Sequence, residues 1–260
     1  MKRCVRKDTP FLLDLLLYFS IKQYYTDKTN MSTFHIKIIA IVTMIIDHIG
    51  LFFFPQIEIF RIIGRIAFPL FAWLIANGAY HTRDIKSYLS RLFYLALISQ
   101  VPFTLANQQI GTSLLYLNVV FTLYLGLLAI YLIKNTKNKF LWPIIILGCS
   151  VVADFIQSDY GAMGVLSVVT FYLFLNSKIK TAISQIILLF VLPLFISILE
   201  IYNKTSFSYL YINSLLEVYG LIALVFIFLY KNIEGRKAKY LFYIVYPLQY
   251  IVIYLVRLAL

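Results

Sequence analysis

IKIIAIVTMIIDHIGLFFF, residues 36–54, is an apolar run interrupted by three ionisable residues, Lys37, Asp47 and His48. A helix of about 20 mostly apolar residues crosses a hydrocarbon core about 30 Å thick. The run therefore predicts a transmembrane helix. An ionisable group at such depth costs about 3 kcal/mol on insertion scales. We expect Asp47 and His48 to have partners or a function that offsets this cost.

The composition extends this prediction to the whole chain. Hydrophobic residues make up 62% of it and charged residues only 13%, and its mean hydropathy is +0.85. Soluble domains carry about 25% charged residues. We expect one multi-pass membrane domain over residues 34–260, after a basic segment over residues 1–33. Within that segment, Phe11–Ile21 is expected to be an amphipathic helix on the cytoplasmic face, and Met31 is an alternative start.

Apolar windows along the chain predict an all-α bundle of nine transmembrane helices, the fifth and sixth joined by the tight turn SDYG. Most of the 23 Lys and Arg lie in the N-terminal region and in every second connection, and Lys204 is the exception in the other set. The positive-inside rule then places the N-terminus in the cytoplasm and the C-terminus outside. The nine windows cover residues 36–55, 60–79, 89–106, 114–133, 140–157, 160–175, 181–201, 209–230 and 239–258.

Several classes of function are disfavoured by this pattern. The net charge of +12 sits in short connections between membrane spans and does not indicate nucleic-acid binding. Cys4 and Cys149 are predicted to be far apart, so no disulfide is expected. One intramembrane His with scattered carboxylates lacks metal-ligand spacing, and no GxSxG motif marks a serine hydrolase.

Polar residues of different spans are predicted to gather at one depth, in the outer half of the bilayer. At 1.5 Å per residue, His48 lies roughly 18 Å from the cytoplasmic edge, and Arg65 enters from the outer side to roughly 7 Å. The inner half carries few polar groups. A polar cavity open to the extracytoplasmic side is therefore expected. Its other candidate members are Asn118, Asp154, Asp159, Tyr160 and Glu217.

Most of these residues have a structural alternative. Asp47 is equally a counter-ion for Arg65, and Arg61 is more readily an interface residue than a ligand. Asn118 can bond a neighbouring helix, and Glu217 is undecided. His35 and His81 lie at cytoplasmic span ends and are expected to be interfacial.

Five motifs along the chain carry a resemblance to a known family. IKIIAIVTMIIDHIG (36–50) and GRIAFPLFAW (64–73) are similar to the first two motifs of the TraX family. LNVVFTLYLGLL (117–128), SDYGAMGVL (158–166) and LFYIVYPLQYIVI (241–253) resemble the later ones in the same order. The resemblance covers roughly residues 34–258. It departs from the family pattern at one place, because Gln249 stands where the motif YPxH commonly has His.

The resemblance implies an integral-membrane acyltransferase that uses acetyl-CoA and acts on an acceptor at or beyond the outer face. TraX proteins are known for acetylating the amino terminus of conjugative pilin. By resemblance, the catalytic positions are His48, Asp47 and Arg65. The positions expected to bind substrate are Arg61, Asn118, Asp159, Tyr160, Glu217 and Tyr246.

The chemistry of these side chains agrees with such a reaction. A neutral His removes a proton from an attacking amine or hydroxyl near pH 7. Arg65, Asn118 or a Tyr hydroxyl can stabilise the oxyanion of a tetrahedral intermediate. The sequence shows no Gly-rich phosphate loop, so it leaves the acetyl-CoA site unplaced.

The sequence thus predicts a multi-pass acyltransferase of the bacterial cytoplasmic membrane. Its acceptor is a peptide or pilin N-terminus, a lipid or a glycan, and no metal or nucleic acid is involved. One alternative is a proton-coupled transporter using Asp47, His48 and Glu217, although neither a repeat nor an interrupted helix is visible in the sequence. The other is a non-enzymatic assembly factor for a surface or conjugation system. The oligomeric state stays open.

Overall fold

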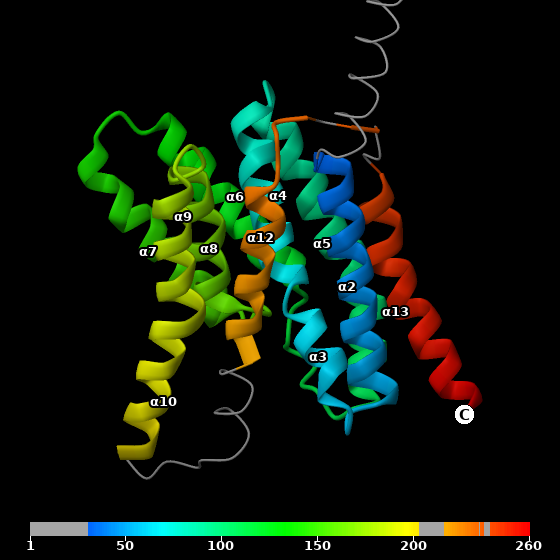
Figure 1. Ribbon diagram of the computed structural model, residues 1–260. Helices are drawn as coiled ribbons and strands as arrows, with labels where there is room; N and C mark the ends of the chain where they lie inside the picture. Colours follow the sequence, from blue (N-terminus) through cyan, green and yellow to red (C-terminus); the bar gives the residue numbers. More distant parts are fainter. Residues whose placement is uncertain (1–30, 203–215, 234, 237–239) are drawn as a thin grey trace, which may run out of the picture.

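The computed structural model describes residues 31–202, 216–233, 235–236 and 240–260, which fold as an all-helical bundle (Figure 1). The helix expected over Phe11–Ile21 and the loop residue Lys204 lie outside the described residues. The α-helices are α2 (Thr33–Phe53), α3 (Glu58–Gly64), α4 (Ala67–His81), α5 (Ile85–Gln108), α6 (Val119–Asn135), α7 (Trp142–Phe155), α8 (Gly161–Leu173), α9 (Lys178–Ile186), α10 (Leu192–Tyr202), α12 (Ala223–Phe228) and α13 (Leu241–Ala259). Three shorter elements are the 3-10 helices η1 (Lys139–Leu141) and η3 (Glu217–Ile222) and the π-helix η2 (Ile187–Val191).

The described part of each predicted span contains helical structure, and five helical stretches of the described chain are long and apolar enough to cross a membrane. The other helices are shorter; α8 has 13 residues, which at 1.5 Å per residue span only about 20 Å. The tight turn predicted between the fifth and sixth spans is confirmed, since α7 ends at Phe155 and α8 begins at Gly161. The five long stretches are Thr33–Phe53, Glu58–His81, Ile85–Gln108, Lys178–Ile198 and Leu241–Ala259.

Local caps determine where several helices begin. Ser32 and His35 form a reciprocal capping box at the start of α2. Asn118 caps α6 by accepting a hydrogen bond from the Val120 amide, at 3.0 Å. These caps fix the first turns of two helices that carry the candidate site.

The second predicted span is not a continuous helix, because it breaks at Arg65 and Ile66 between α3 and α4. Pro69 explains the break: it has no amide hydrogen to donate to the carbonyl of Arg65, four residues earlier, and its ring crowds that carbonyl. Gly220 of η3 packs closely against the freed carbonyl of Arg65. A Cβ on Gly220 would lie only 3.1 Å from that carbonyl oxygen. The break places Arg65 at the junction of α3, α4 and η3.

Two further spans also depart from regular α-helix. The seventh contains the π-helix η2, and the described part of the eighth, from residue 216 on, contains the 3-10 helix η3. No interrupted helix was visible in the sequence, whereas the structure contains these departures. A signal was available at each, because Pro193 has no amide hydrogen for the carbonyl of Leu189 in η2, four residues earlier, and Gly220 lies within η3.

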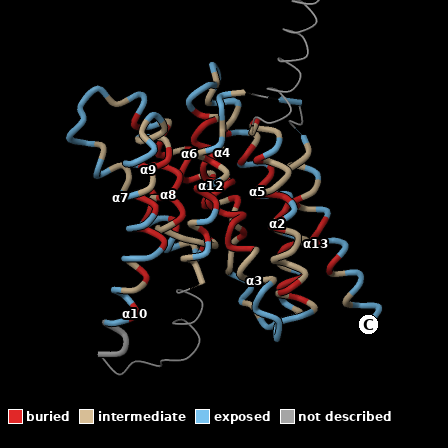
Figure 2. The backbone as a smooth tube through the Cα atoms, viewed as in Figure 1, coloured by how far each residue is buried: buried red, intermediate tan, exposed pale blue. Residues whose placement is uncertain are grey.

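The core lies around α4, α6 and α8, where buried segments concentrate (Figure 2). The apolar window of Glu58–His81 is 67% buried in the protein, against 22% for that of Leu241–Ala259. Close approach of α6 and α8 requires Gly126, whose added Cβ would lie 2.7 Å from Val168. Hence α4 is central, whereas α13 covers the bundle from outside.

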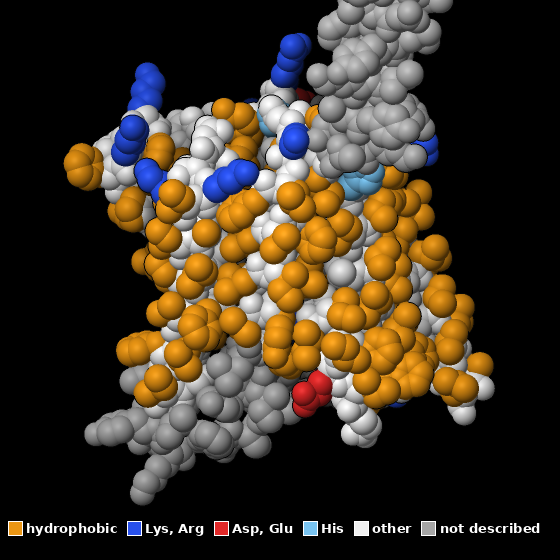
Figure 3. Space-filling view, in the orientation of Figure 1, with side chains coloured by type: hydrophobic (Ala, Val, Ile, Leu, Met, Phe, Trp, Pro, Cys, Tyr) orange, Lys and Arg blue, Asp and Glu red, His pale blue; other side chains and the backbone are white. Residues whose placement is uncertain are grey.

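Basic side chains gather at one end of the molecule (Figure 3). This end carries the beginning of α2 and the connections from α4 to α5 and from α6 to α7 (Figure 1). The sides between the two ends are covered by hydrophobic side chains (Figure 3). We call this the basic end, and the candidate site lies nearer the opposite end, because His48 is close to the end of α2.

Candidate functional site

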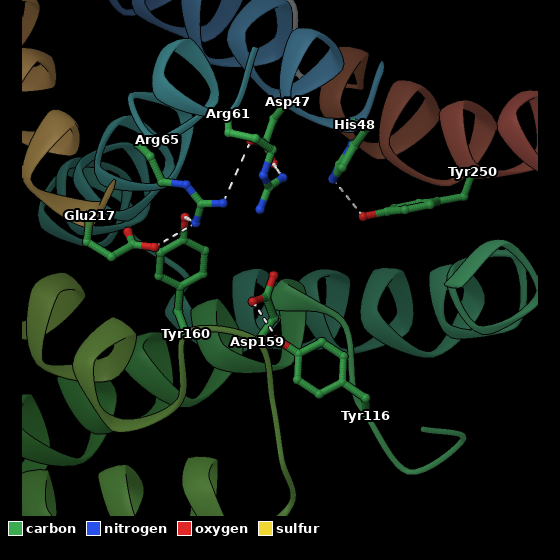
Figure 4. A network of polar contacts seen from close by, with 9 residues as sticks. All are labelled: Asp47, His48, Arg61, Arg65, Tyr116, Asp159, Tyr160, Glu217 and Tyr250. Carbon is green, nitrogen blue, oxygen red and sulfur yellow. Dashed lines mark hydrogen bonds and ion pairs between the residues drawn. The ribbon is translucent and has the colours of Figure 1, made fainter. Parts of the chain in front are cut away.

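A chain of ion pairs joins three elements of the bundle (Figure 4). Arg61 Nη1 lies 2.7 Å from Asp47 Oδ2. Arg65 Nη1 lies 2.6 Å from Glu217 Oε1, and its Nη2 lies 3.9 Å from Asp47 Oδ1. Asp47 is on α2, Arg61 is on α3, Arg65 is the C-cap residue of α3, and Glu217 is the first residue of η3. The chain of charges therefore fastens α2, α3 and η3 together at the level of the candidate site.

The partners within this chain differ from the simplest expectation. The predicted approach of Arg65 to Asp47 is confirmed, but Arg61 is the closer partner of Asp47 and Glu217 the closer partner of Arg65. Gly64 permits this packing, since a Cβ on it would lie 2.0 Å from the Asp47 carboxylate. The Arg65 side chain is only 9% exposed, so its ion pairs are largely desolvated.

Tyr160 connects these ion pairs to the turn between α7 and α8. Arg65 Nη1 lies 3.3 Å from the Tyr160 hydroxyl, and the Tyr160 ring stacks on Phe68 with centroids 3.8 Å apart. Tyr160 has φ of 64°, which is uncommon for a non-glycine residue and occurs often at functional sites. The turn is held by the Asp154 carboxylate, which accepts a hydrogen bond from the Ala162 amide at 2.7 Å.

Asp159 lies opposite Asp47 across the same space (Figure 4). Its carboxylate accepts a 2.8 Å hydrogen bond from the Tyr116 hydroxyl, and its amide donates to the Leu117 carbonyl at 2.9 Å. Thr122 of α6 also donates to the Asp159 carbonyl. These bonds join the turn before α8 to the beginning of α6.

Asn118 is fully buried, and its hydrogen-bonding groups are occupied. Its amide nitrogen donates to Gln100 Oε1 at 2.8 Å and to the Ala96 carbonyl at 2.9 Å. Its side-chain oxygen is used in the α6 cap. The structure thus gives Asn118 a helix-joining and capping role, which was its structural alternative, and does not direct its amide toward His48.

His48 takes no part in the ion pairs and uses only one of its two ring nitrogens in a hydrogen bond. Its Nε2 lies 2.9 Å from the Tyr250 hydroxyl, whereas its Nδ1 is buried without a hydrogen-bond partner. Both residues line a cavity of about 50 Å³. The other lining residues are Met44, Asp47, Gly64, Ala67, Phe68, Phe71, Val119, Leu123, Asp159, Tyr160 and Tyr246.

The structure therefore brings together eight of the nine predicted site residues. Asp47, His48, Asp159, Tyr160 and Tyr246 line the cavity. Arg61, Arg65 and Glu217 stand behind this lining through the ion pairs described above.

Two aromatic residues of the site, Tyr116 and Tyr250, were not predicted. One signal for Tyr250 was available, because Tyr246 and Tyr250 are four residues apart and so lie on the same face of α13. Tyr116 precedes α6 and carries no comparable pattern. Its bond to Asp159 depends on the tertiary arrangement alone.

A second and larger cavity, of about 650 Å³, lies at the basic end. Few polar groups were expected in this half from the amino-acid sequence, and this cavity was not predicted. Arg91, Lys37, His81 and Arg236 line it together with aromatic side chains. Phe71 and Leu123 line both cavities and so separate them.

Arg91 has features of an anion-binding residue within this larger cavity. Its Nε is buried without a hydrogen-bond partner, and its guanidinium carbon lies 5.6 Å from the centroid of the Tyr88 ring. Guanidinium groups bind phosphates through paired hydrogen bonds. For metal ions, the described residues hold no group of three or more His, Cys, Asp or Glu suited to bind one.

Chemically, the smaller cavity combines a basic nitrogen with hydroxyl donors. A neutral imidazole accepts a proton, and the hydroxyls of Tyr160 and Tyr246 can donate to a developing negative charge. The Tyr246 hydroxyl is fully buried and has no hydrogen-bond partner. An occupant with an oxygen or nitrogen acceptor would satisfy it.

Comparison with known proteins gives one family and two curated relatives. The profile of the family described as "TraX protein" matches residues 32–257. The chain is 33% identical over 116 residues to "Uncharacterized protein RP591" of Rickettsia prowazekii (strain Madrid E), which covers 45% of this chain and 43% of that protein. It is 36% identical over 113 residues to "Probable fimbrial assembly protein FimC, serogroup H1" of Dichelobacter nodosus. That match covers 39% of this chain and 46% of the relative. These matches span less than half of each relative, and no solved structure matches significantly.

Proposed function

The chain belongs to the TraX family, and from this membership and the cluster around His48 we propose that it is an integral-membrane acyltransferase. It transfers an acetyl group from acetyl-CoA to an extracytoplasmic or membrane-associated acceptor. The acceptor is a peptide N-terminus such as that of a pilin, a lipid or a glycan. One relative is named a probable fimbrial assembly protein, which agrees with an acceptor in surface-appendage assembly.

The observation that carries the proposal is the setting of His48. Its Nε2 faces a small cavity also lined by Asp47, Tyr160 and Tyr246. Three carboxylates and two guanidinium groups surround the space, namely those of Asp47, Asp159, Glu217, Arg61 and Arg65. When all five are ionised their net charge is −1, which a protonated His48 imidazole would balance. The site is therefore suited to accept a proton on His48 during the reaction.

The roles of the other residues follow from their contacts. His48 removes the proton of the attacking amine or hydroxyl. Because Arg65 donates to the Tyr160 oxygen, the Tyr160 hydroxyl is a stronger donor toward an oxyanion. Tyr246 supplies a second hydroxyl. Arg61 holds the Asp47 carboxylate in place, and Glu217 does the same for Arg65.

The larger cavity is the place for the acyl donor. Acetyl-CoA supplies an activated thioester and carries several phosphates, which suit the cations Arg91, Lys37 and Arg236. The buried, unpaired Nε of Arg91 supports this fit. Phe71 and Leu123 line both this cavity and the one that holds His48, so the two cavities are neighbours.

Arg91→Ala is expected to weaken acetyl-CoA binding by about tenfold or more, the effect of losing one charge-assisted contact of about 1.5 kcal/mol. Titration calorimetry on purified protein measures this. Arg83→Ala is the matched control, because Arg83 is exposed in the connection just before α5, the helix that carries Arg91, and does not line the cavity. Unchanged affinity in Arg91→Ala would contradict the placement of the donor.

We further propose that the protein lies in the bacterial cytoplasmic membrane with nine spans, the N-terminus inside and the C-terminus outside. The gathering of Lys and Arg at one end supports this orientation (Figure 3). Cysteines introduced at Ser113 and Lys137, in a background without Cys4 and Cys149, are expected to react with impermeant maleimide from opposite sides. Reaction of both from the same side would refute the orientation.

The interrupted helices keep a proton-coupled transporter as the second candidate, because transporters use broken helices at their binding sites. Toward the basic end, however, the cavity that holds the polar cluster is bounded by the apolar side chains of Phe71 and Leu123. A relay across the membrane would need to continue past them. The third reading, a non-enzymatic assembly factor, predicts that acetyl-CoA does not bind.

Mass spectrometry tests the proposed function. Surface peptides, polymers and lipids are compared between cells with and without the protein. Acceptors that carry one acetyl group only in the presence of the protein would support the proposal and identify the substrate. Identical masses in every fraction would contradict it.

A further inference from the structure

Gln249 of α13 lies against the same face of α2 as His48. Its side chain is 9% exposed, and its Nε2 lies 3.5 Å from the sulfur of Met44, one helical turn before His48. The next residue of α13, Tyr250, contacts the His48 ring itself, with its hydroxyl 2.9 Å from Nε2. Gln249 is therefore buried against the part of α2 that carries Met44 and His48.

Two atoms at this contact are buried and unsatisfied. Gln249 Oε1 has no hydrogen-bond partner, and neither has His48 Nδ1. Leaving a buried polar group unpaired costs about 1–3 kcal/mol. The amide oxygen is an acceptor only, so it suits Nδ1 in the tautomer in which that nitrogen carries the hydrogen. A hydrogen bond from His48 Nδ1 to Gln249 Oε1 would satisfy both atoms at once.

We propose that Gln249 is the positioning residue of His48: it accepts the Nδ1 hydrogen and thereby makes Nε2 the basic nitrogen that faces Tyr250 and the cavity. The catalytic meaning of this arrangement rests on the proposed acyltransferase function. The tautomer itself does not.

The register of α13 supports the proposal independently. Tyr246, Gln249 and Tyr250 occupy positions i, i+3 and i+4 and are the buried polar residues of that helix. Gln249 contacts Met44, one turn before His48, and the Tyr250 hydroxyl contacts Nε2 of His48. One face of α13 thus supplies a hydroxyl at Nε2 and, through Gln249, an acceptor for the unpaired Nδ1. With Nδ1 protonated, Tyr250 donates its hydroxyl hydrogen to Nε2, and both contacts hold a single tautomer.

The opposite orientation of the amide predicts a different result. If Nε2 of Gln249 faced His48, it would donate to Nδ1, and Nε2 of His48 would carry the hydrogen. The oxygen would then face the Met44 sulfur, which is a weak acceptor and offers no hydrogen. The orientation with Nε2 on the sulfur is the one that leaves both groups paired.

Nitrogen-15 NMR of histidine-labelled full-length protein in lipid nanodiscs distinguishes the two tautomers. The chain has only 3 His, so the spectrum of His48→Gln assigns the His48 signals by difference. The wild type is expected to show His48 with its hydrogen on Nδ1. Gln249→Met, which keeps the length of the side chain and removes the acceptor, is expected to lose this preference. A wild-type spectrum with the hydrogen on Nε2, or an unchanged tautomer in Gln249→Met, would overturn the proposal.

Two further variants separate this role from general packing. Gln249→Glu retains an acceptor oxygen and is expected to keep the Nδ1 hydrogen. Met44→Leu removes the sulfur contact and is expected to leave the tautomer unchanged. Loss of the wild-type tautomer in Gln249→Glu would count against the proposal, because the acceptor is still present.

Acyl transfer measured on the same variants tests the catalytic consequence. Gln249→Met is expected to lower kcat by about 10²-fold, the lower range of general base catalysis, and Gln249→Glu to restore part of it. If no variant, the wild type included, transfers an acyl group while the Nδ1 tautomer is observed, the proposed function fails and the role of Gln249 in fixing the tautomer stands. The two failures are thus distinguishable.

Discussion

Replacing His48 with alanine is expected to lower acyl transfer by about 10²–10⁴-fold, the range that a positioned general base contributes. His48 is the only imidazole lining the small cavity among the described residues. Its removal leaves the attacking nucleophile without a proton acceptor there. Mass spectrometry of the acceptor, or transfer of labelled acetyl groups by purified protein, measures the effect.

His35→Gln is the matched control for this experiment. His35 lies at the other end of the same helix and takes part in the capping box of α2, where Gln is also a suitable residue. The control is expected to transfer at the wild-type rate. Binding of acetyl-CoA should persist in His48→Ala, because the donor cavity does not include His48. Full transfer by His48→Ala would exclude it as the base.

Glu217→Ala is expected to destabilise the folded protein by about 3 kcal/mol, since it leaves a largely buried arginine without its closest partner. Asp47 remains 3.9 Å from Arg65, and the Tyr160 hydroxyl stays in place. These contacts moderate the loss but do not replace a 2.6 Å ion pair. Unfolding in mixed micelles with increasing denaturing detergent measures the change in free energy.

The double variant Arg65→Met with Glu217→Leu shows whether the pair or its separate halves matter. Replacing a buried ion pair by apolar side chains is often nearly neutral for stability. The double variant is therefore expected to be more stable than Glu217→Ala, although it removes the partner of Tyr160. Glu58→Ala is the control, because Glu58 is exposed near the same end, and a change below about 0.5 kcal/mol is expected. Equal stability of Glu217→Ala and the wild type would show that Arg65 does not depend on this pair.

The amino-acid sequence by itself determined the class of the fold. Long apolar runs and the sparse, one-sided distribution of Lys and Arg are local properties, and they indicate the positions of the helices and the basic end. The short connection after α2 is enough to predict that Asp47 and Arg65 are neighbours. Pro69 also carries the signal for the break at Arg65, because the effect of proline reaches only four residues back.

Only the tertiary structure decided which polar groups meet. Arg65 pairs with Glu217 across 152 residues, and His48 meets Tyr250 across 202. The sequence spacing allows Asp47 to form an ion pair with either Arg61 or Arg65. The packing of α3 against α2 makes Arg61 the closer partner. The rotation and depth of each helix depend on the packing of the whole bundle, because lipid and protein interior are equally apolar and local hydropathy does not distinguish them. For that reason the sequence singled out His48 and Gln249, whereas the structure revealed Tyr250, the packing of Gln249 against Met44 and the second cavity.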